Sequence, residues 1–328
     1  MDIYFMKAYG KLCELIENGT CETFHYRSEL GEVDHMFIKR KIERCIDGRQ
    51  YFDLTTPYGY GGPLMKAADP ANKAKLCEDF GKSFAEYCLA QNIVCEFIRF
   101  HPIIGNAEDF QQLYSPEYNR NTLGTNLADN EDPIQSEFSK GCRKSIRQAL
   151  RKGISYRVTK SPDNIDSFID IYYSTMKRDN AKEFYYFGNE YFQTLLDTLK
   201  EYVLFVEAVF EEKTIAAGLY FITDGTIHTH LSGTLSEYLY LSPAYILRYA
   251  AALWGKENGY ALIHHGGGTS SDRENSLFQF KKQFAQKTEF PFYLGKKIWN
   301  LSVYEELCSM NPEAKNSNYF PKYRYRHS

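Results

Sequence analysis

Two adjacent lysines stand between aromatic residues in the segment FQFKKQF, residues 278–284. Lys281 and Lys282 are side chains that can hold a positive charge beside a reacting carbonyl group. When an amine attacks such a carbonyl, a tetrahedral oxyanion develops, and a fixed cation next to that oxygen lowers the barrier. The same spacing also fits a surface lysine on an amphipathic helix. The segment therefore indicates either a catalytic cation or a solvated helix face.

Two histidines and three glycines precede these lysines along the chain. His264 and His265 end an apolar stretch and are followed by Gly266, Gly267 and Gly268. An imidazole at a strand end can accept the proton of an attacking amine, so His265 is a candidate catalytic base. Gly267 and Gly268 are candidate substrate-binding residues because they can present backbone N–H groups, although such runs are also flexible connections.

Two further histidines, His228 and His230, alternate along an expected strand and would share one face of it. No third ligand accompanies them in the sequence, so we expect no metal site. Because no Ser-His-Asp arrangement or carboxylate pair stands out, hydrolase chemistry is poorly supported.

The segment TTPYGYGGPL, residues 55–64, follows an apolar run and is rich in glycine. One interpretation makes it a wall of an acceptor cleft, in which Tyr58, Tyr60, Gly61 and Gly62 contact the substrate. The alternative is a wide turn whose glycines permit positive φ. The segment matches no phosphate-binding loop pattern.

Six cations lie in one expected helix: Lys140, Arg143, Lys144, Arg147, Arg151 and Lys152. Most charged runs form a solvated helix face. Guanidinium groups also match phosphate oxygens, so Arg143 and Arg147 are candidate ligands for a nucleotide-linked precursor, a lipid-linked sugar or tRNA.

Hydrophobic periodicity and turn residues place these motifs on regular elements. The expected elements are strands at 35–42 and 50–54, a helix at 71–92, a strand at 93–100, a helix from Ser161-Pro162, strands at 203–210, 214–222 and 226–232, a helix from Ser242-Pro243 and a strand at 260–265.

The two halves of the chain repeat one order of elements, because segment 51–100 matches segment 227–265 in order and rough length. Such repetition indicates a duplicated α+β unit. We therefore expect two domains, residues 1–135 and 136–328, with the basic helix at 137–152 leading into the second.

The composition is that of an ordinary globular protein, with 328 residues, 43% of them hydrophobic and 25% charged. A net charge of -3 argues against a DNA-binding protein. The eight cysteines are scattered, which favours reduced thiols. We find no signal peptide and no apolar run that could span a membrane, so we expect a cytoplasmic protein with at most peripheral membrane contact.

Three motifs in order, PYGYGGPL, KGCRKSIRQALRKGISYRV and HHGGG…SLFQFKKQF, resemble the Fem-type peptidyltransferases of the GCN5-related N-acyltransferase (GNAT) superfamily. The resemblance covers about residues 3–297. It implies two tandem GNAT-like domains, each a mixed central sheet flanked by helices. It also implies that Lys281 is the catalytic cation and that Tyr173 and Arg178 bind the acceptor.

The chain departs from ordinary GNAT enzymes at the loop that holds coenzyme A pyrophosphate. At the corresponding position, residues 239–244 read LYLSPA, without glycines. The donor therefore stays open between acyl-CoA and aminoacyl-tRNA. The long coiled-coil arm of some Fem proteins is also absent from the sequence.

The sequence as a whole predicts an acyltransferase that moves an acyl or aminoacyl group to an amine of a cell-envelope precursor, such as a peptidoglycan stem peptide or an amino sugar. The alternatives are an acetyl-CoA-dependent N-acetyltransferase of a small amine and a double-GNAT scaffold that binds without catalysis.

Overall fold

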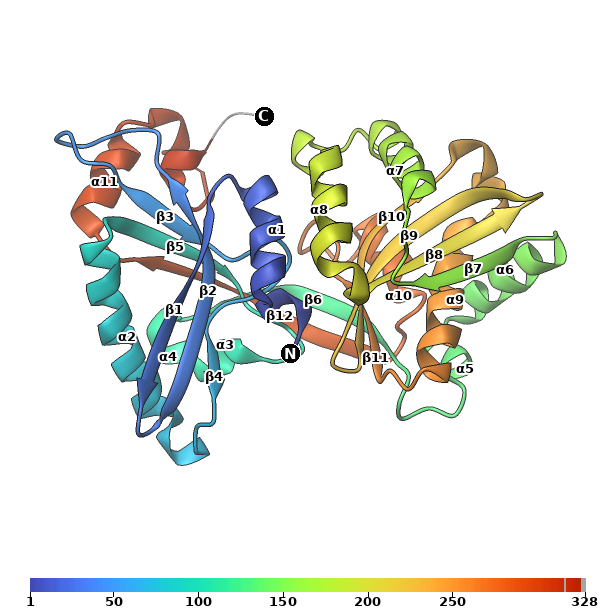
Figure 1. Ribbon diagram of the computed structural model, residues 1–328, viewed down its shortest axis with the longest axis horizontal. Coiled ribbons are helices and arrows are strands. Elements are labelled where there is room, and N and C mark those ends of the chain that lie inside the picture. The colour runs from blue at the N-terminus through green and yellow to red at the C-terminus, as the bar shows by residue number, and fades with distance from the viewer. Residues whose placement is uncertain (316, 326–328) are drawn as a thin grey trace. The chain divides into compact units, whose positions relative to one another are not determined.

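The computed structural model of the chain describes residues 1–315 and 317–325. The chain forms two compact units, each assembled from segments that are distant in the sequence (Figure 1). Unit 1 comprises Met1–Ile3 and Arg120–Phe290, and unit 2 comprises Tyr4–Asn119 and Pro291–Ser328. These units describe packing alone, and the boundary expected between residues 135 and 136 stays a prediction.

Unit 1 is built around a mixed sheet in the order β6-β11-β10-β9-β8-β7, in which only the β10–β11 pair is parallel among the pairs recorded for the described residues. Its elements are β6 (Glu117–Asn126), α5 (Pro133–Glu137), α6 (Lys140–Arg151), β7 (Ser155–Lys160), α7 (Asp166–Arg178), α8 (Asn189–Leu199), β8 (Val203–Phe210), β9 (Lys213–Thr223), β10 (Thr226–Thr234), α9 (Pro243–Glu257), β11 (Leu262–Gly266) and α10 (Ser276–Lys282), with short 3₁₀ turns at Glu183–Tyr185, Lys200–Tyr202 and Ser236–Leu241.

Unit 2 also contains a mixed sheet, in the order β1-β2-β3-β5-β12, with β4 paired to β2 and with β3 parallel to β5. Its elements are α1 (Lys7–Glu17), β1 (Thr20–Ser28), β2 (Gly31–Lys41), β3 (Phe52–Thr55), β4 (Leu64–Lys66), α2 (Lys73–Ala90), β5 (Ile93–Arg99), α3 (Asn106–Asp109), α4 (Gln111–Tyr114), the later part of β12 (Thr288–Ile298) and α11 (Leu301–Ser309), with 3₁₀ turns at Ile3–Phe5, Pro70–Asn72, Pro312–Ala314 and Lys322–Arg324. In both units, mixed β-structure flanked by helices confirms the predicted fold class.

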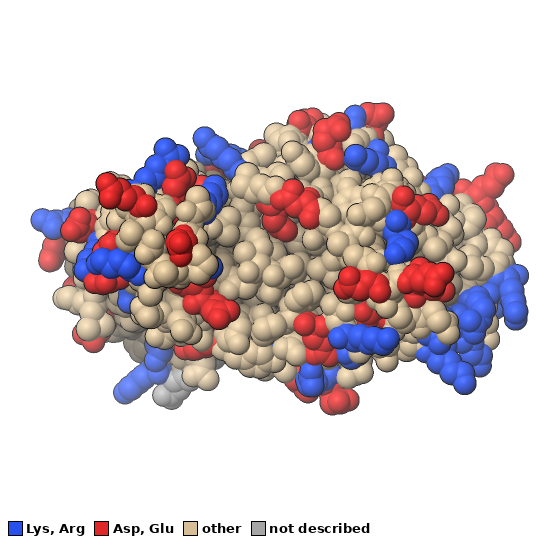
Figure 2. Space-filling model, turned by 90° about the horizontal axis from the view of Figure 1, so that it is seen from below, with Lys and Arg blue, Asp and Glu red and all other residues tan. Residues whose placement is uncertain are grey.

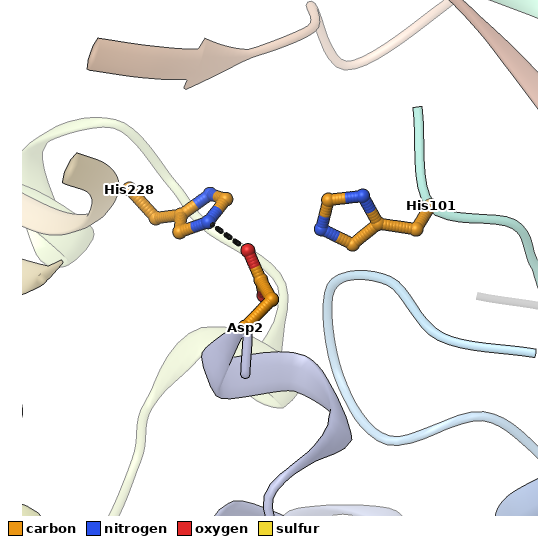
Figure 3. A group of neighbouring side chains, drawn as sticks. All are labelled: Asp2, His101 and His228. Carbon is orange, nitrogen blue, oxygen red and sulfur yellow. Dashed lines mark hydrogen bonds and ion pairs between the residues drawn. The ribbon is translucent and has the colours of Figure 1, made fainter. Parts of the chain in front are cut away.

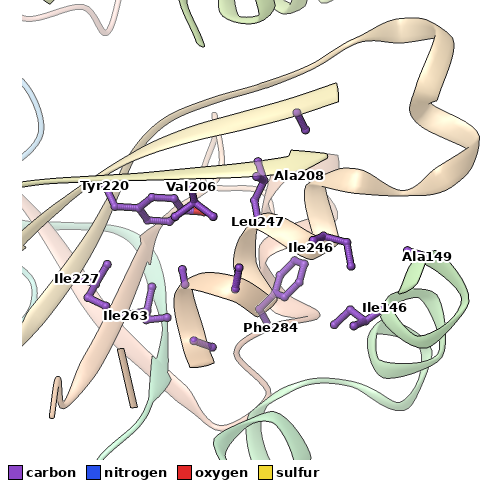
Figure 4. Packing of buried hydrophobic residues seen from close by; sticks show 14 of the residues in the cluster. Ile146, Ala149, Val206, Ala208, Tyr220, Ile227, Ile246, Leu247, Ile263 and Phe284 are labelled. Atoms are coloured by element: carbon purple, nitrogen blue, oxygen red, sulfur yellow. The ribbon is translucent and has the colours of Figure 1, made fainter. Parts of the chain in front are cut away.

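The two faces of the unit 1 sheet bury different side chains, because successive residues of a strand point to opposite faces. On β8, Leu204 and Val206 join the core cluster that also contains residues of α6 and α9 (Figure 4). Glu207 follows Val206 and so lies on the opposite face, where it accepts a hydrogen bond from Ser167 of α7. Helices therefore cover both faces of this sheet, with α6 and α9 on one and α7 on the other.

The β9–β10 hairpin forms where the Asp-Gly pair predicted a turn. Asp224 and Gly225 both adopt positive φ, 41° and 75°. Two consecutive positive φ values give a turn whose twist matches that of the flanking strands. This hairpin fixes the register of β10 and thereby the positions of its histidines.

The helix expected from Ser161-Pro162 begins later, at Asp166. Ser161 adopts a left-handed φ of 55° and donates its backbone N–H to the carbonyl of Val203 at 2.9 Å. It therefore closes the β7–β8 pairing instead of capping a helix. The other expected helices and strands are present, with ends shifted by a few residues. Within the described part of the chain, the helices are all too short or too polar to span a lipid bilayer.

Close packing of α7 against β10 depends on a glycine, which yields a test of the fold. A Cβ added at Gly233 would lie 2.8 Å from the carbonyl oxygen of Ile171 and 2.9 Å from Oγ1 of Thr175. We expect Gly233→Ala to lower the free energy of unfolding by about 1–3 kcal/mol, because α7 must shift. Gly141→Ala, on the exposed side of α6, is the matched control and should be neutral or stabilising. Equal denaturant midpoints for both variants would contradict this packing.

Candidate active site

The parallel pairing of β10 with β11 is short, and both strands are irregular where it ends. The ladder runs from Thr226 paired with Leu262 to His228 paired with His264, whereas β10 continues to Thr234. The register of β10 against β9 shifts between Thr229 and Leu231, and that of β11 against β6 shifts between His264 and Gly266. Bulges of this kind redirect side chains, and here each of the two strands has one just beyond the last parallel pair.

His265 is the residue at the β11 bulge, and it is buried. Oγ1 of Thr125 donates its hydrogen to the carbonyl of Phe284 at 2.6 Å, so in its 2.8 Å contact with His265 the imidazole Nε2–H is the donor. Nδ1 therefore carries the lone pair, and Oγ1 of Thr229 lies 3.4 Å from it. Burial, together with the charges of Arg248 and Lys281, lowers the pKa of His265 well below its usual value. The imidazole is thus neutral at pH 7.

Lys281 lies on α10, whose first turn is capped by Asn275 through a 3.2 Å hydrogen bond from the N–H of Phe278. Its Nζ donates to the carbonyl of Gly267 at 2.7 Å. Burial lowers the pKa of Lys281 to about 7, and the positive charges of Arg248 and Arg120 act in the same direction. The amine therefore exchanges between charged and neutral forms near neutral pH.

The adjacent Lys282 has different surroundings. Its Nζ forms an ion pair with Glu289 at 2.6 Å and donates to the carbonyl of Gln286 at 3.1 Å. Of the two lysines in the motif, Lys281 thus has the environment that suits chemistry, and Lys282 is a structural cation.

The glycine run beside Lys281 is packed closely. The carbonyl of Gly267 accepts from Lys281, and that of Gly268 accepts from Arg120 at 2.7 Å. A Cβ at Gly268 would lie 2.7 Å from Oδ1 of Asn275, the cap of α10. These glycines hold α10 against the end of β11, and their predicted substrate contacts stay a prediction.

The other histidines of β10 and β11 have local partners. Nε2 of His228 lies 2.7 Å from Oδ2 of Asp2 (Figure 3), and Nε2 of His264 lies 2.9 Å from Oγ1 of Thr122. His230, at the β10 bulge, pairs with the hydroxyl of Tyr191 at 2.8 Å, and burial lowers its pKa to about 3. His230 is therefore neutral throughout the physiological range.

Cations of α6 form a basic surface on unit 1. Figure 2 shows Lys and Arg side chains gathered at the end of the view where Figure 1 places α6. Arg147 is exposed there, whereas Arg143 donates to the carbonyl of Gln135 at 3.1 Å and to that of Phe138. Arg143 thus also holds the turn before the helix. The phosphate contacts predicted for both arginines stay predictions.

Tyr173 and Arg178 on α7 support neighbouring backbone. The hydroxyl of Tyr173 donates to the carbonyl of Phe187, and Arg178 donates to the carbonyl of Thr234 at 2.7 Å, at the end of β10. The neighbouring Tyr172 is buried. An acceptor-binding role for Tyr173 and Arg178 stays a prediction.

The glycine-rich segment of unit 2, residues 55–64, is a turn held by hydrogen bonds. The carbonyl of Tyr58 accepts a hydrogen bond from the hydroxyl of Tyr9 at 2.7 Å, and the N–H of Gly61 donates to the backbone carbonyl of Arg99 at 2.8 Å. Gly62 has a φ of 90°, and a Cβ there would lie 2.9 Å from Ile98.

The ring of Tyr60 packs within unit 2 at 5.2 Å from Tyr4 and 5.7 Å from His101. His101 in turn lines a cavity of about 350 Å³ in that unit. The glycines therefore serve the turn, and the substrate contacts predicted for Tyr58, Tyr60, Gly61 and Gly62 stay predictions.

Sequence reasoning missed the residues that surround Lys281 and His265. Arg248 is buried on α9 with Nη1 at 2.8 Å from the hydroxyl of Tyr220, and Arg120 reaches Gly268 from β6. The available signal was the segment YILRYAAALW, in which one arginine interrupts an otherwise apolar helix. A charged side chain is rarely fully buried in a protein unless it is paired.

Comparison with known proteins places this geometry in a family context. Residues 136–282 match the acetyltransferase (GNAT) domain family. No curated protein sequence matches the chain. The matched family supports the prediction that the chain is an N-acyltransferase.

Solved structures resemble the chain over most of its length. FemX aligns with a TM-score of 0.68 at 13% identity, covering 93% of this chain and 94% of FemX. The C-terminal domain of a proposed lysylphosphatidylglycerol synthetase from Agrobacterium fabrum aligns at 0.56 and 16% identity, covering 90% and 89%. L-PGS from Bacillus licheniformis aligns at 0.53 and 14% identity, covering 89% and 93%. Residues 136–282 thus match the GNAT acetyltransferase domain family, and the chain has the fold of FemX, as the predicted Fem-like resemblance implied.

Proposed function

We propose that the chain moves an acyl or aminoacyl group from an activated carrier to an amine of a cell-envelope precursor. The observation that carries this proposal is Lys281, a partly buried amine with a pKa of about 7 that donates to Gly267 where β10 and β11 part. A cation in a water-poor site stabilises a developing oxyanion far better than one in bulk water.

The proposed reaction is direct transfer without a covalent enzyme intermediate. The acceptor amine attacks the donor carbonyl, and the protonated Lys281 stabilises the tetrahedral oxyanion. The new C–N bond forms, the bond to the carrier breaks, and the amine loses a proton. His265, neutral with its lone pair on Nδ1, is the proposed proton acceptor. The departing thiol or ribose hydroxyl takes up a proton.

The donor is acyl-CoA or aminoacyl-tRNA in this proposal. The acetyltransferase family match favours acyl-CoA. The β10–α9 connection lacks the glycines with which ordinary GNAT enzymes hold the pyrophosphate of coenzyme A, because α9 begins directly at Ser242-Pro243. The phosphates of the donor would therefore be bound by other groups. Nζ of Lys152, at the end of α6, lies 5.7 Å from the ring centre of Tyr240 in that connection. The basic surface of α6, with Arg147, therefore adjoins the connection and is proposed to bind phosphates of the donor.

The acceptor is proposed to be an envelope component. The Agrobacterium fabrum protein is named for a lysyl group on phosphatidylglycerol, and this supports an acceptor of the same compartment. Tyr58, Tyr60, Tyr173 and Arg178 are the proposed acceptor contacts. A cytoplasmic enzyme with at most peripheral membrane contact fits both donors, and neither needs a metal ion or DNA.

A second candidate is an acetyl-CoA-dependent N-acetyltransferase of a small amine, favoured by the match of residues 136–282. A scaffold without catalysis is the third. Thermal stabilisation of the wild-type protein by acyl-CoAs, by charged tRNA and by UDP-linked muropeptides ranks these candidates, because a ligand of the folded state raises Tm by mass action. Stabilisation by acyl-CoA alone supports the second candidate.

Replacement of Lys281 tests the enzyme directly. We expect Lys281→Met to lower kcat by about 10²- to 10³-fold, the usual effect of removing one oxyanion-stabilising group. The affinity for the donor should change little, because the interaction is made in the transition state. Turnover is measured with the donor and acceptor that the thermal comparison identifies.

Lys282→Met is the matched control, since it removes the same charge one residue along α10. Its ion pair with Glu289 is only partly buried, and the variant should keep kcat within about threefold of wild type. Equal activities of the Lys281→Met variant and the control would refute the catalytic assignment.

The state of Lys281 can be measured without a substrate. The pKa of about 7 in the folded protein lies below the usual 10.5 of the unfolded chain, so the unfolded state binds more protons between these values. The stability of wild type relative to Lys281→Met should therefore rise as pH increases from 7 towards 10. Denaturant midpoints of both proteins at pH 7 and pH 9.5, in a buffer free of phosphate, check this. A constant difference would mean that Lys281 titrates normally.

A further inference from the structure

Unit 2 contains a cavity at the end of β5 that has no part in the proposed reaction. Its volume is about 350 Å³, within the range of cavities that hold small molecules. It is lined by residues of segment 100–111, by Pro116 and by Pro291 and Tyr293 of β12. Because β5 runs parallel to β3, the cavity lies beyond the carboxyl end of a parallel strand, where sheets of this kind commonly bind ligands.

One wall of this cavity is held in place by Asn106, which is fully buried. Its Oδ1 accepts a hydrogen bond from the N–H of His101 at 2.8 Å. Its Nδ2 donates to the carbonyls of Gly61 and Pro63, each at 2.9 Å, and so ties segment 100–111 to the glycine-rich turn. A wall that is fixed before a ligand arrives costs less conformational entropy on binding.

The backbone around the cavity offers few hydrogen-bond donors. Pro102, Pro116 and Pro291 have no N–H group. At several other lining residues the N–H is already bonded within unit 2, namely at Phe100, His101, Gly105 and Glu108. A ligand whose polar atoms are acceptors would therefore find few partners, whereas a ligand that donates hydrogen bonds suits this lining.

The charge of the lining comes from Glu108. Among the described residues that line the cavity, it is the only Asp, Glu, Lys or Arg, and it is exposed. Its carboxylate has no ion-pair partner in the described part of the chain, and the nearby Lys73 is paired with Asp109 at 2.7 Å. His101 adds no positive charge, because its Nδ1 accepts the N–H of Ile104 at 3.2 Å and thus carries the lone pair.

We propose that this cavity binds a small organic cation with N–H donors, that is, a protonated primary or secondary amine. The carboxylate of Glu108 would pair with the ammonium group. The rings of Phe100 and Tyr293 would contact the hydrocarbon part, and their faces also attract positive charge. Alkylammonium groups stay charged near neutral pH. The site goes beyond the proposed function, because it uses neither Lys281 nor His265.

The test compares two probes of similar size and opposite charge, phenethylamine and 3-phenylpropionate. Affinities are measured by isothermal titration calorimetry on the whole chain, near neutral pH and at fixed ionic strength. Glu108→Gln keeps the size of the side chain and removes its charge. Glu29→Gln, at the exposed turn between β1 and β2, is the matched control.

We expect wild type and Glu29→Gln to bind phenethylamine saturably, and Glu108→Gln to bind it about fivefold or more weakly, as an exposed ion pair allows. 3-Phenylpropionate should bind wild type more weakly than the amine does, because its carboxylate meets Glu108 and few donors. The proposal is overturned if wild type shows no saturable binding of the amine, if Glu108→Gln binds it as wild type does, or if both probes bind equally well.

Two further variants locate the bound amine. Gln111→Trp adds a large side chain to the lining from an exposed position, so it should abolish binding, and unchanged binding would place the amine elsewhere. Lys281→Met should bind phenethylamine as wild type does. If binding is instead lost in Lys281→Met and kept in Glu108→Gln, the amine occupies the proposed active site. That result overturns the cavity in unit 2 as an amine site while the proposed function stands.

Discussion

The short parallel pairing between β10 and β11 is the constraint on which the candidate site depends. The ladder ends at His228 and His264, and a bulge follows on each strand. Because a bulge adds one residue to one strand, it changes which side chains face the helices beyond it. The ring of His265 lies beside that of Phe284, which packs in the core with residues of α9, and Thr125 fixes its tautomer.

The choice of neutral partners for the cations follows from what the site is proposed to do. A carboxylate beside Lys281 would hold the lysine in its charged form, but it would also cancel most of the field that an oxyanion feels. The carbonyl of Gly267 orients the amine at 2.7 Å without adding a full negative charge. Burial and Arg248 then bring the pKa to about 7.

The sequence predicted local features well, because turns and amphipathic helices are encoded by neighbouring residues. The Asp224-Gly225 turn and the start of α9 after Ser242 are examples. It failed at Ser161, where a contact with the distant Val203 replaces a helix cap. The cluster of Arg248, Arg120 and Lys281 was beyond sequence reasoning for the same reason. These residues come from α9, β6 and α10, and only the strand order brings them together.

The choice between Lys281 and Lys282 was likewise beyond helical phase. Residues three and four apart in a helix both share a face, so both lysines lie on the side of Phe278, which is 5% exposed. What separates them is their partners: Lys281 donates to the carbonyl of Gly267, which follows β11, and Lys282 pairs with Glu289 of β12. The surroundings that lower the pKa of Lys281 are therefore set by segments distant in the sequence.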